Sequence, residues 1–176
     1  MARLGCYCGA EMTNTEAPSK NILKIFYYSE AQDAIRENPT IRLWDFYTGW
    51  DEKNERNNSF MKRTEPVEYW KCSVCKRVYE VQAQSCGQIL RAYKPQEKFE
   101  TENVNVSNLK ELLVLEDVEM DNMLSEEESM TLNEYLNKGK QLRYYISEDE
   151  GTAFIVNADN QIVGAYKQTQ KLLQEE

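Results

Sequence analysis

Two pairs of closely spaced cysteines are the strongest constraint on the fold of this chain. The first pair is Cys6-Tyr7-Cys8, followed by Gly9, and the second is Cys72-Ser73-Val74-Cys75. Each pair places two sulfur atoms on one tight turn, and four thiolates complete a tetrahedral zinc site. Such a site is closed, because it leaves no coordination position for a substrate. The sequence therefore predicts one structural zinc ion bound by Cys6, Cys8, Cys72 and Cys75.

Other interpretations of the cysteines stay open at this point. The thiols could be unconnected, or Cys72, Cys75 or Cys86 could serve a thiol enzyme. A redox dithiol usually opens a helix that follows a strand. Here Cys75 leads into Lys76-Arg77-Val78-Tyr79-Glu80-Val81, which has the pattern of a strand, so the spacing favours zinc. Cys86 lies next to Gly87 in an expected turn, and we interpret it as a spare thiol.

Composition argues against an enzyme and against membrane insertion. The 176 residues include no histidine, which removes the commonest general acid and base and the usual partner of a serine or cysteine nucleophile. No apolar run is long enough for a transmembrane helix, and the N-terminus lacks the apolar core of a signal peptide. Cysteines at metal-binding spacing fit a reducing compartment. We therefore expect a cytoplasmic protein that is not an enzyme.

The negative charge is concentrated in the second half of the chain. Residues 1–98 hold 15 Lys and Arg against 13 Asp and Glu, whereas residues 99–176 hold 6 against 17. A half this acidic repels a phosphate backbone and attracts a basic protein. The pattern favours a protein partner over nucleic acid. Solubility alone is an equally consistent explanation of the charge.

A short repeat divides the chain into two halves. The pattern Gln-Ile-x-x-Ala-Tyr-Lys occurs at residues 88–94 and again at 161–167. An apolar strand pattern precedes each copy, at residues 78–81 and 153–156, so each copy predicts a β-hairpin. Going back from the hairpins, Cys72 and Cys75 align with Ser147 and Glu150. The second half has therefore lost the cysteines, and one zinc ion follows.

The repeat extends upstream into a strand and a helix in each half. Residues 23–28 predict a strand, followed by a helix with Ser29 as its N-cap. Residues 112–115 and 118–126 take the same roles later, with Glu30 matching Glu119, and Thr131 opens one more helix through a capping box with Glu134. The predicted fold is α+β: two tandem small units of strand, helix, strand and hairpin, at residues 1–98 and 104–176, the first carrying the zinc ribbon.

An acidic segment in the second unit is the candidate surface for a partner. Its carboxylates could meet lysines and arginines of a basic protein, although a solvated helix is the alternative. The candidate residues are Glu116, Asp117, Glu119, Asp121, Glu126, Glu127 and Glu128.

The order of motifs resembles a known group of proteins. Cys-x-Cys-Gly, a strand followed by Ser-Glu-x-x-Asp, then Tyr-Trp-x-Cys-x-x-Cys and a hairpin ending in Tyr-Lys are similar to small zinc-ribbon proteins of Gram-positive bacteria. Those proteins occur beside polymorphic or contact-dependent toxins and are regarded as immunity proteins. Lys76 departs from the pattern, because glycine is common at that position.

The resemblance implies that the protein binds and blocks a cognate toxin domain, of which many are basic nucleases. The alternative is a zinc-ribbon adaptor that binds nucleic acid or the transcription machinery.

Overall fold

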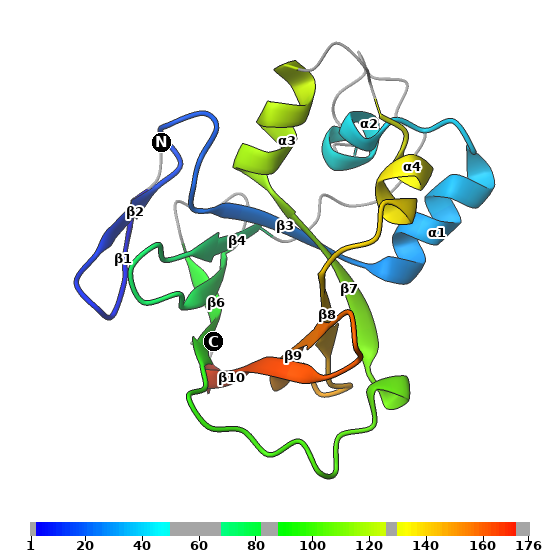
Figure 1. The fold of residues 1–176 in the computed structure, drawn as a ribbon. Coiled ribbons are helices and arrows are strands. Elements are labelled where there is room, and N and C mark those ends of the chain that lie inside the picture. Colours follow the sequence, from blue (N-terminus) through cyan, green and yellow to red (C-terminus); the bar gives the residue numbers. More distant parts are fainter. Residues whose placement is uncertain (1–2, 50–67, 82–87, 126–129, 172–176) are drawn as a thin grey trace, which may run out of the picture.

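Eight antiparallel strands close into one barrel in the computed structural model, which describes residues 3–49, 68–81, 88–125 and 130–171 (Figure 1). Around the barrel the strand order is β10-β6-β5-β4-β3-β7-β8-β9, and β9 pairs with β10 to close it. The strands are β3 (Ile22–Tyr27), β4 (Glu68–Lys71), β5 (Val78–Val81), β6 (Ile89–Pro95), β7 (Lys110–Glu116), β8 (Leu142–Ile146), β9 (Thr152–Asn157) and β10 (Ile162–Lys171).

The strands form because apolar and aromatic side chains alternate between two faces. In β3, Ile25 and Tyr27 line the interior of the barrel, and Phe26, which also borders the cavity, packs in a core with Phe46 of the helical layer. In β7, Val114 faces the interior and Leu115 the same outer core. Side chains therefore extend from both faces of these central strands. β-branched and aromatic residues suit such strands, because they pack well on a pleated surface.

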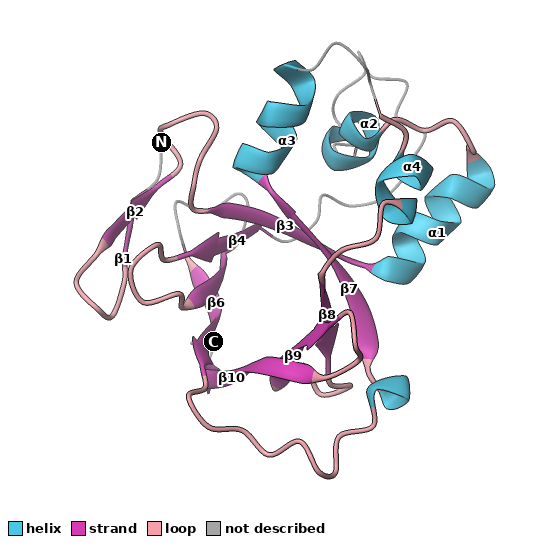
Figure 2. Cartoon of the chain, in the orientation of Figure 1, coloured by secondary structure: helices cyan, strands magenta, loops and turns pink. Residues whose placement is uncertain are grey.

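Helices cover the outer face of β3 and β7 (Figure 2). They are α1 (Tyr28–Glu37), α2 (Leu43–Thr48), α3 (Asp117–Ser125) and α4 (Leu132–Asn137), and a short 3-10 turn, η1 (Val106–Asn108), precedes β7. Phe26 and Phe46 are fully buried in this core, with ring centroids 4.7 Å apart. None of the helices in the described ranges is long and apolar enough to cross a membrane.

A two-stranded hairpin packs on a different part of the barrel. Strands β1 (Arg3–Gly5) and β2 (Glu11–Thr13) pair with each other and lie apart from the helices in Figure 1. Leu4 and Met12 of the hairpin share a buried core with Trp70 and Tyr79 of β4 and β5. The barrel thus has two separate outer cores, one helical and one made by the hairpin.

The predicted fold class is wrong. The molecule is mostly β, and its halves do not form two tandem α+β units, because β3 pairs with β7 and β6 pairs with β10 across the halves. The physical reason is that a four-strand unit exposes two edges of unpaired backbone groups, and closure of a barrel removes them. The division at residues 98 to 104 stays a prediction about the sequence; in the structure this stretch lies between β6 and η1.

The two halves meet at matching positions. With Glu30 aligned on Glu119, Ile25 corresponds to Val114, and these residues are partners in the β3–β7 ladder. By the same alignment Arg42 corresponds to Thr131, and they form an isolated bridge between the helix starts. At the other junction, Lys94 pairs with Lys167, its counterpart in the repeated motif. At each junction, therefore, a residue of the first half pairs with the aligned residue of the second half.

The starts of two helices test the predicted capping residues: one prediction is confirmed and the other is wrong. Helix α4 begins after Thr131, whose hydroxyl accepts a hydrogen bond from Glu134 N at 3.2 Å, so the predicted capping box is confirmed. Helix α1 begins one residue before Ser29, and Glu30 Oε2 accepts from Tyr27 N at 2.9 Å. The N-cap prediction at Ser29 is therefore wrong, because Tyr27 takes that position.

Candidate metal centre

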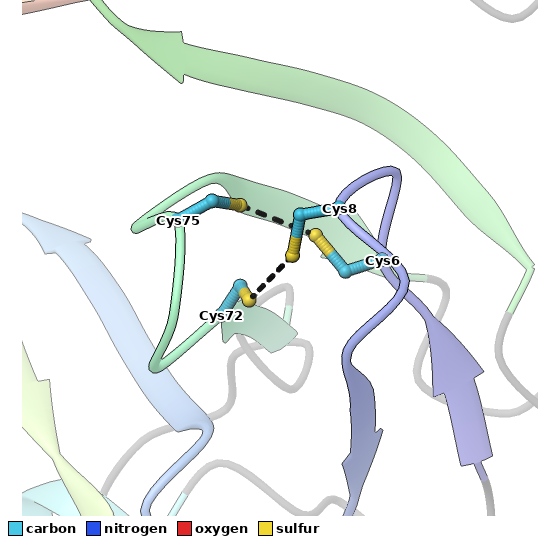
Figure 3. Close-up of side chains that lie close together, drawn as sticks. All are labelled: Cys6, Cys8, Cys72 and Cys75. Atoms are coloured by element: carbon cyan, nitrogen blue, oxygen red, sulfur yellow. Dashed lines mark hydrogen bonds between the residues drawn. The ribbon is translucent and has the colours of Figure 1, made fainter.

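Four sulfur atoms converge between the β1–β2 turn and the β4–β5 turn (Figure 3). Cys6 Sγ lies 3.3 Å from Cys75 Sγ, and Cys8 Sγ lies 3.7 Å from Cys72 Sγ. All four sulfur atoms lie within 4.8 Å of one another. Each predicted pair contributes one sulfur to each close contact, so the two turns interdigitate.

The arrangement fits a tetrahedral metal ion. With Zn–S bonds of about 2.3 Å, the sulfur atoms of a regular tetrahedron lie about 3.8 Å apart. The two close contacts, at 3.3 and 3.7 Å, lie slightly below that value, and no separation exceeds 4.8 Å. Four thiolates also suit zinc, because soft sulfur ligands in a tetrahedral set favour it over magnesium or calcium. Within the described residues, no histidine or carboxylate joins this group.

Backbone hydrogen bonds shape the two turns. Gly9 N donates to Cys6 O at 2.9 Å, and the φ of +85° at Gly9 is one that glycine adopts without strain. In the second turn Lys76 N donates to Cys72 O at 3.0 Å, and Lys76 has a φ of 62°. Both turns therefore have a left-handed residue just after their second cysteine, a conformation that glycine adopts at the lowest cost.

Tyr79 contacts the first turn through its hydroxyl group. Its hydroxyl lies 3.0 Å from Cys6 Sγ and accepts a hydrogen bond from Tyr7 N at 3.2 Å. Such outer contacts orient metal ligands and adjust their basicity. Tyr79 is fully buried between the hairpin and the barrel, so the position of Cys6 is fixed by the core itself.

The thiols differ in acidity. Burial raises the pKa of Cys6, but hydrogen bonds from the Cys8 backbone and Tyr79 outweigh it and bring the pKa to about 6. Burial raises the pKa of Cys75 to about 11, with a further contribution from the neighbouring cysteines. The difference is expected when sulfur atoms this close compete for negative charge, and a bound cation would remove the competition.

The cysteine cluster has a buried side and an exposed side. Cys6 and Cys72 belong to the core beneath the hairpin, whereas the residues between the cysteines point away. Tyr7 is 72% exposed and Val74 is 69% exposed, more than any other large apolar residue in the described ranges. We call these two side chains the turn tips.

The structure places the predicted acidic residues around the start of α3. Glu116 is exposed at the end of β7 and forms an ion pair with Lys71, whose Nζ lies 3.4 Å from Glu116 Oε1. Asp121 is exposed on α3. Glu126, Glu127 and Glu128 lie outside the described residues. Lys71 directly precedes Cys72, so Glu116 lies at the same end of the barrel as the metal centre.

Two of the acidic residues have roles within the fold. Asp117 accepts hydrogen bonds from Ser19 N at 2.7 Å and from the Tyr47 hydroxyl at 2.8 Å. Glu119 accepts from the Tyr135 hydroxyl at 2.9 Å. Their use by a partner stays a prediction, as it does for the exposed carboxylates. Cys86, interpreted as a spare thiol, lies outside the described residues.

Sequence reasoning missed the interior of the barrel. A cavity of about 420 Å³ lies within it, lined by residues from β3 to β10 and by Glu30 of α1. Tyrosines and glutamates from distant positions meet there. The only signal in the sequence is the alternation along each strand, which does not reveal that the strands close.

Comparison with known proteins identifies a family whose function is unknown. Residues 2–97, more than half of the chain, match the family described as Domain of unknown function (DUF8617). The chain belongs to this family. The matched part contains β1 to β6 and all four cysteines of the metal centre. No curated protein and no solved structure matches the chain.

Proposed function

We propose that Cys6, Cys8, Cys72 and Cys75 hold one structural zinc ion, and that the protein is a cytoplasmic immunity protein. It binds a cognate toxin domain, which we expect to be a basic nuclease, and covers its functional surface. The exposure of Tyr7 and Val74 on the turn tips is the observation that carries this proposal.

The ion supplies rigidity rather than chemistry. Four thiolates fill a tetrahedral ion, so substrate has no position to bind. An ion bound to all four sulfur atoms would link Cys6 and Cys8 of the hairpin to Cys72 and Cys75 of the barrel. The hairpin itself has only three residues in each strand, and an isolated hairpin of this size has little stability in water. Zinc would hold it in place, together with the tyrosine and valine it presents.

The turn tips have the properties of a protein contact. An exposed aromatic and an exposed aliphatic side chain on rigid turns lose little conformational freedom on binding, and such anchors carry much of the energy of an interface. The start of α3 is tied to this end, because Asp117 accepts from Ser19 N in the segment between β2 and β3. Exposed carboxylates such as Glu116 and Asp121 then attract a basic toxin and accelerate association.

A binding measurement with the product of the neighbouring gene tests the proposal. We expect binding below micromolar concentration, weakened tenfold or more in the double variant Y7A/V74S. The matched control is V163S, because Val163 is 49% exposed on β10. Failure of the native protein to bind at micromolar concentration, or equal losses in the tip variant and the control, contradicts the proposal.

A charge reversal tests the electrostatic part separately. Asp121→Lys should slow association several-fold at low salt, and the difference should shrink as salt rises. Glu97→Lys is the control, since Glu97 is exposed in the linker after β6. Identical association rates for the two variants would remove the acidic segment from the interface.

One observation favours the alternative of a nucleic-acid adaptor. Lys76 and Arg77 follow the second cysteine pair, and the guanidinium of Arg77 lies 5.5 Å from the centre of the Tyr7 ring. A cation next to an exposed aromatic ring can contact a phosphate and a base. A gel shift with RNA or DNA that weakens steeply with salt, and that is lost in Arg77→Ala, would favour the adaptor over the immunity protein.

A further inference from the structure

The interior of the barrel has the size of a small-molecule site. Its cavity measures about 420 Å³, the liquid volume of roughly fourteen water molecules at about 30 Å³ each. Ligand sites in proteins commonly fall between about 300 and 1,000 Å³, and eight-stranded barrels leave an interior that can hold one small ligand. The volume is therefore sufficient for a ligand with a single ring and a short chain.

The walls are apolar and aromatic. Aliphatic side chains and five tyrosines line the cavity, and the tyrosines offer both ring faces and hydroxyl groups. The aliphatic residues include Ile25, Val114 and Ile155, and the tyrosines are Tyr27, Tyr69, Tyr93, Tyr144 and Tyr166. Such walls accept the hydrocarbon part of a ligand and tolerate a cation over a ring face.

The charges in the cavity are unbalanced toward the negative. Four carboxylates line it, those of Glu30, Glu80, Glu116 and Glu150, together with the ammonium group of Lys71. Arg91, which contacts Glu80 and Glu150, adds one more cation. An anionic ligand would be repelled by this excess of negative charge, whereas a cation would relieve it.

Most of these carboxylates already have donors. Glu150 forms an ion pair with Arg91 and accepts from the Tyr27 hydroxyl at 2.7 Å. Glu30 accepts from Tyr27 N, and Glu116 pairs with Lys71. The side chains of Arg91 and Glu150 are 29% and 32% exposed, so this polar end of the cavity reaches solvent.

Glu80 is the exception. Its side chain is 10% exposed, and within the described part of the chain its Oε2 is the buried side-chain oxygen that accepts no hydrogen bond. Arg91 Nε lies 3.4 Å from that oxygen, within ion-pair distance but without hydrogen-bond geometry. Burial raises the pKa of Glu80, so desolvation outweighs the attraction of Arg91. A buried carboxylate oxygen without a donor costs stability, and such groups are seldom kept without a use.

We propose that the barrel interior binds a small organic amine, with its hydrocarbon part among the tyrosines and its ammonium group donating to the Glu80 carboxylate, which lines the cavity. The ammonium group offsets the excess negative charge beside a carboxylate whose Oε2 accepts no hydrogen bond within the described residues. Apart from Glu116, which also belongs to the acidic surface proposed for the toxin, this site shares no residue with the cysteine cluster or the turn tips.

Three probes of one shape test the charge preference. We would measure the binding of 2-phenylethylamine, 2-phenylethanol and 3-phenylpropionate to the full-length, metal-loaded protein by calorimetry, and map shifts in amide NMR spectra. The amine should bind at least tenfold more tightly than the alcohol, the carboxylate should bind weakest, and shifts should cluster on strands whose side chains line the cavity. Equal binding of amine and alcohol, or shifts on the outer face alone, would overturn the proposal.

Variants separate Glu80 from a general effect of charge. Glu80→Gln should bring the amine's affinity down to that of the alcohol and leave the alcohol unchanged. Glu111→Gln is the matched control, because Glu111 is also partly buried with a raised pKa but is not among the residues lining the cavity. If both variants retain native amine binding, Glu80 is not the acceptor and the proposal fails. Circular dichroism of each variant confirms that it is folded.

Discussion

The β4–β5 turn and the β8–β9 turn occupy equivalent places in the two halves but have different tasks. Each spans six residues between the flanking ladder pairs, Lys71 with Val78 and Ile146 with Ala153. In the first, Cys72 and Cys75 reach the hairpin outside the barrel. In the second, Ser147 and Glu150 stand at the corresponding positions.

The second turn holds its shape through its own side chains. Ser147 Oγ accepts from Thr152 N at 3.1 Å, and Asp149 Oδ1 accepts from Gly151 N at 3.0 Å. Glu150, which takes the place of Cys75, instead meets Arg91 and Tyr27 at the polar end of the cavity. Turns at equivalent places of the barrel can therefore have different roles. The β4–β5 turn contacts the outer hairpin, and the β8–β9 turn supplies a side chain to the interior.

Loss of the metal centre should have the largest effect on this comparison. Cys72→Ser removes a ligand at the first turn, whereas Ser147→Ala changes the equivalent residue of the second. Structural zinc contributes about 10–16 kcal/mol of apparent binding energy in small peptides, so we expect C72S to lose zinc and several kcal/mol of stability. S147A should cost about 1 kcal/mol. Elemental analysis and chemical denaturation measure both.

The barrel changes what zinc removal should look like. Because β3–β7 and β6–β10 join the halves, loss of the hairpin should destabilise the barrel in one transition rather than unfold residues 1–98 alone. Metal-free native protein with an unchanged melting temperature, or a protein purified without stoichiometric zinc, would contradict the metal centre.

The cluster of four cysteines could be predicted from the sequence, and the barrel could not. Cys-x-Cys and Cys-x-x-Cys are local patterns with a geometric meaning, and the structure brings all four sulfur atoms together. The pairing of Lys94 with Lys167 joins residues far apart in the chain, and nothing in either strand specifies which edge it will meet. Strand propensity describes a pleated surface, whereas the partner is chosen by the whole fold.

The cavity residues were missed for the same reason. Glu80 reads as a polar position in an alternating strand, which predicts exposure to solvent. Closure turns that face inward, so the rule for an open sheet gives the wrong side. The sequence marks Glu150 only as the counterpart of Cys75 in the second half. Its role depends on Tyr27 and Arg91, which lie in the other half of the chain.

Removal of the Glu150 charge should have the next largest effect. Glu150→Gln weakens the bonds to Arg91 and Tyr27, and hydrogen bonds to charged groups contribute about 1.5–3 kcal/mol each, so we expect a loss of about 2 kcal/mol at neutral pH. Arg91 and Tyr27 hold the pKa of Glu150 below its usual value. Its contribution is therefore complete above the unfolded pKa and is lost as pH falls through the folded pKa. Denaturation at neutral and acidic pH should show the variant's deficit shrinking in acid.

Glu80→Gln should change stability in the opposite direction. Burial raises the pKa of Glu80, so the folded state disfavours its charge, and the neutral variant should be more stable by about 1 kcal/mol at pH 7. As pH falls through the raised pKa, the native carboxyl takes up a proton and the advantage disappears. Urea denaturation of both proteins across that range measures the difference. A variant less stable than the native protein at pH 7 would mean that Arg91 satisfies Glu80 after all.

Lys76→Gly tests the smallest difference between the turns. Both contain a left-handed residue other than glycine, Lys76 with φ 62° and Glu150 with φ 56°. A left-handed backbone destabilises the folded state by about 1–2 kcal/mol at a residue with a side chain. Glycine removes this strain, but it lowers stability by about 0.4–1 kcal/mol because the unfolded chain has more conformational freedom. The bond from Lys76 Nζ to Ser73 O is exposed and contributes little. We therefore expect a net gain of about 0.5 kcal/mol with zinc binding intact. In contrast, Glu150→Gly should destabilise the protein, because that left-handed residue also supplies the carboxylate for Arg91. A loss of stability in K76G would show that its side chain, and not its backbone, decides the residue at this turn.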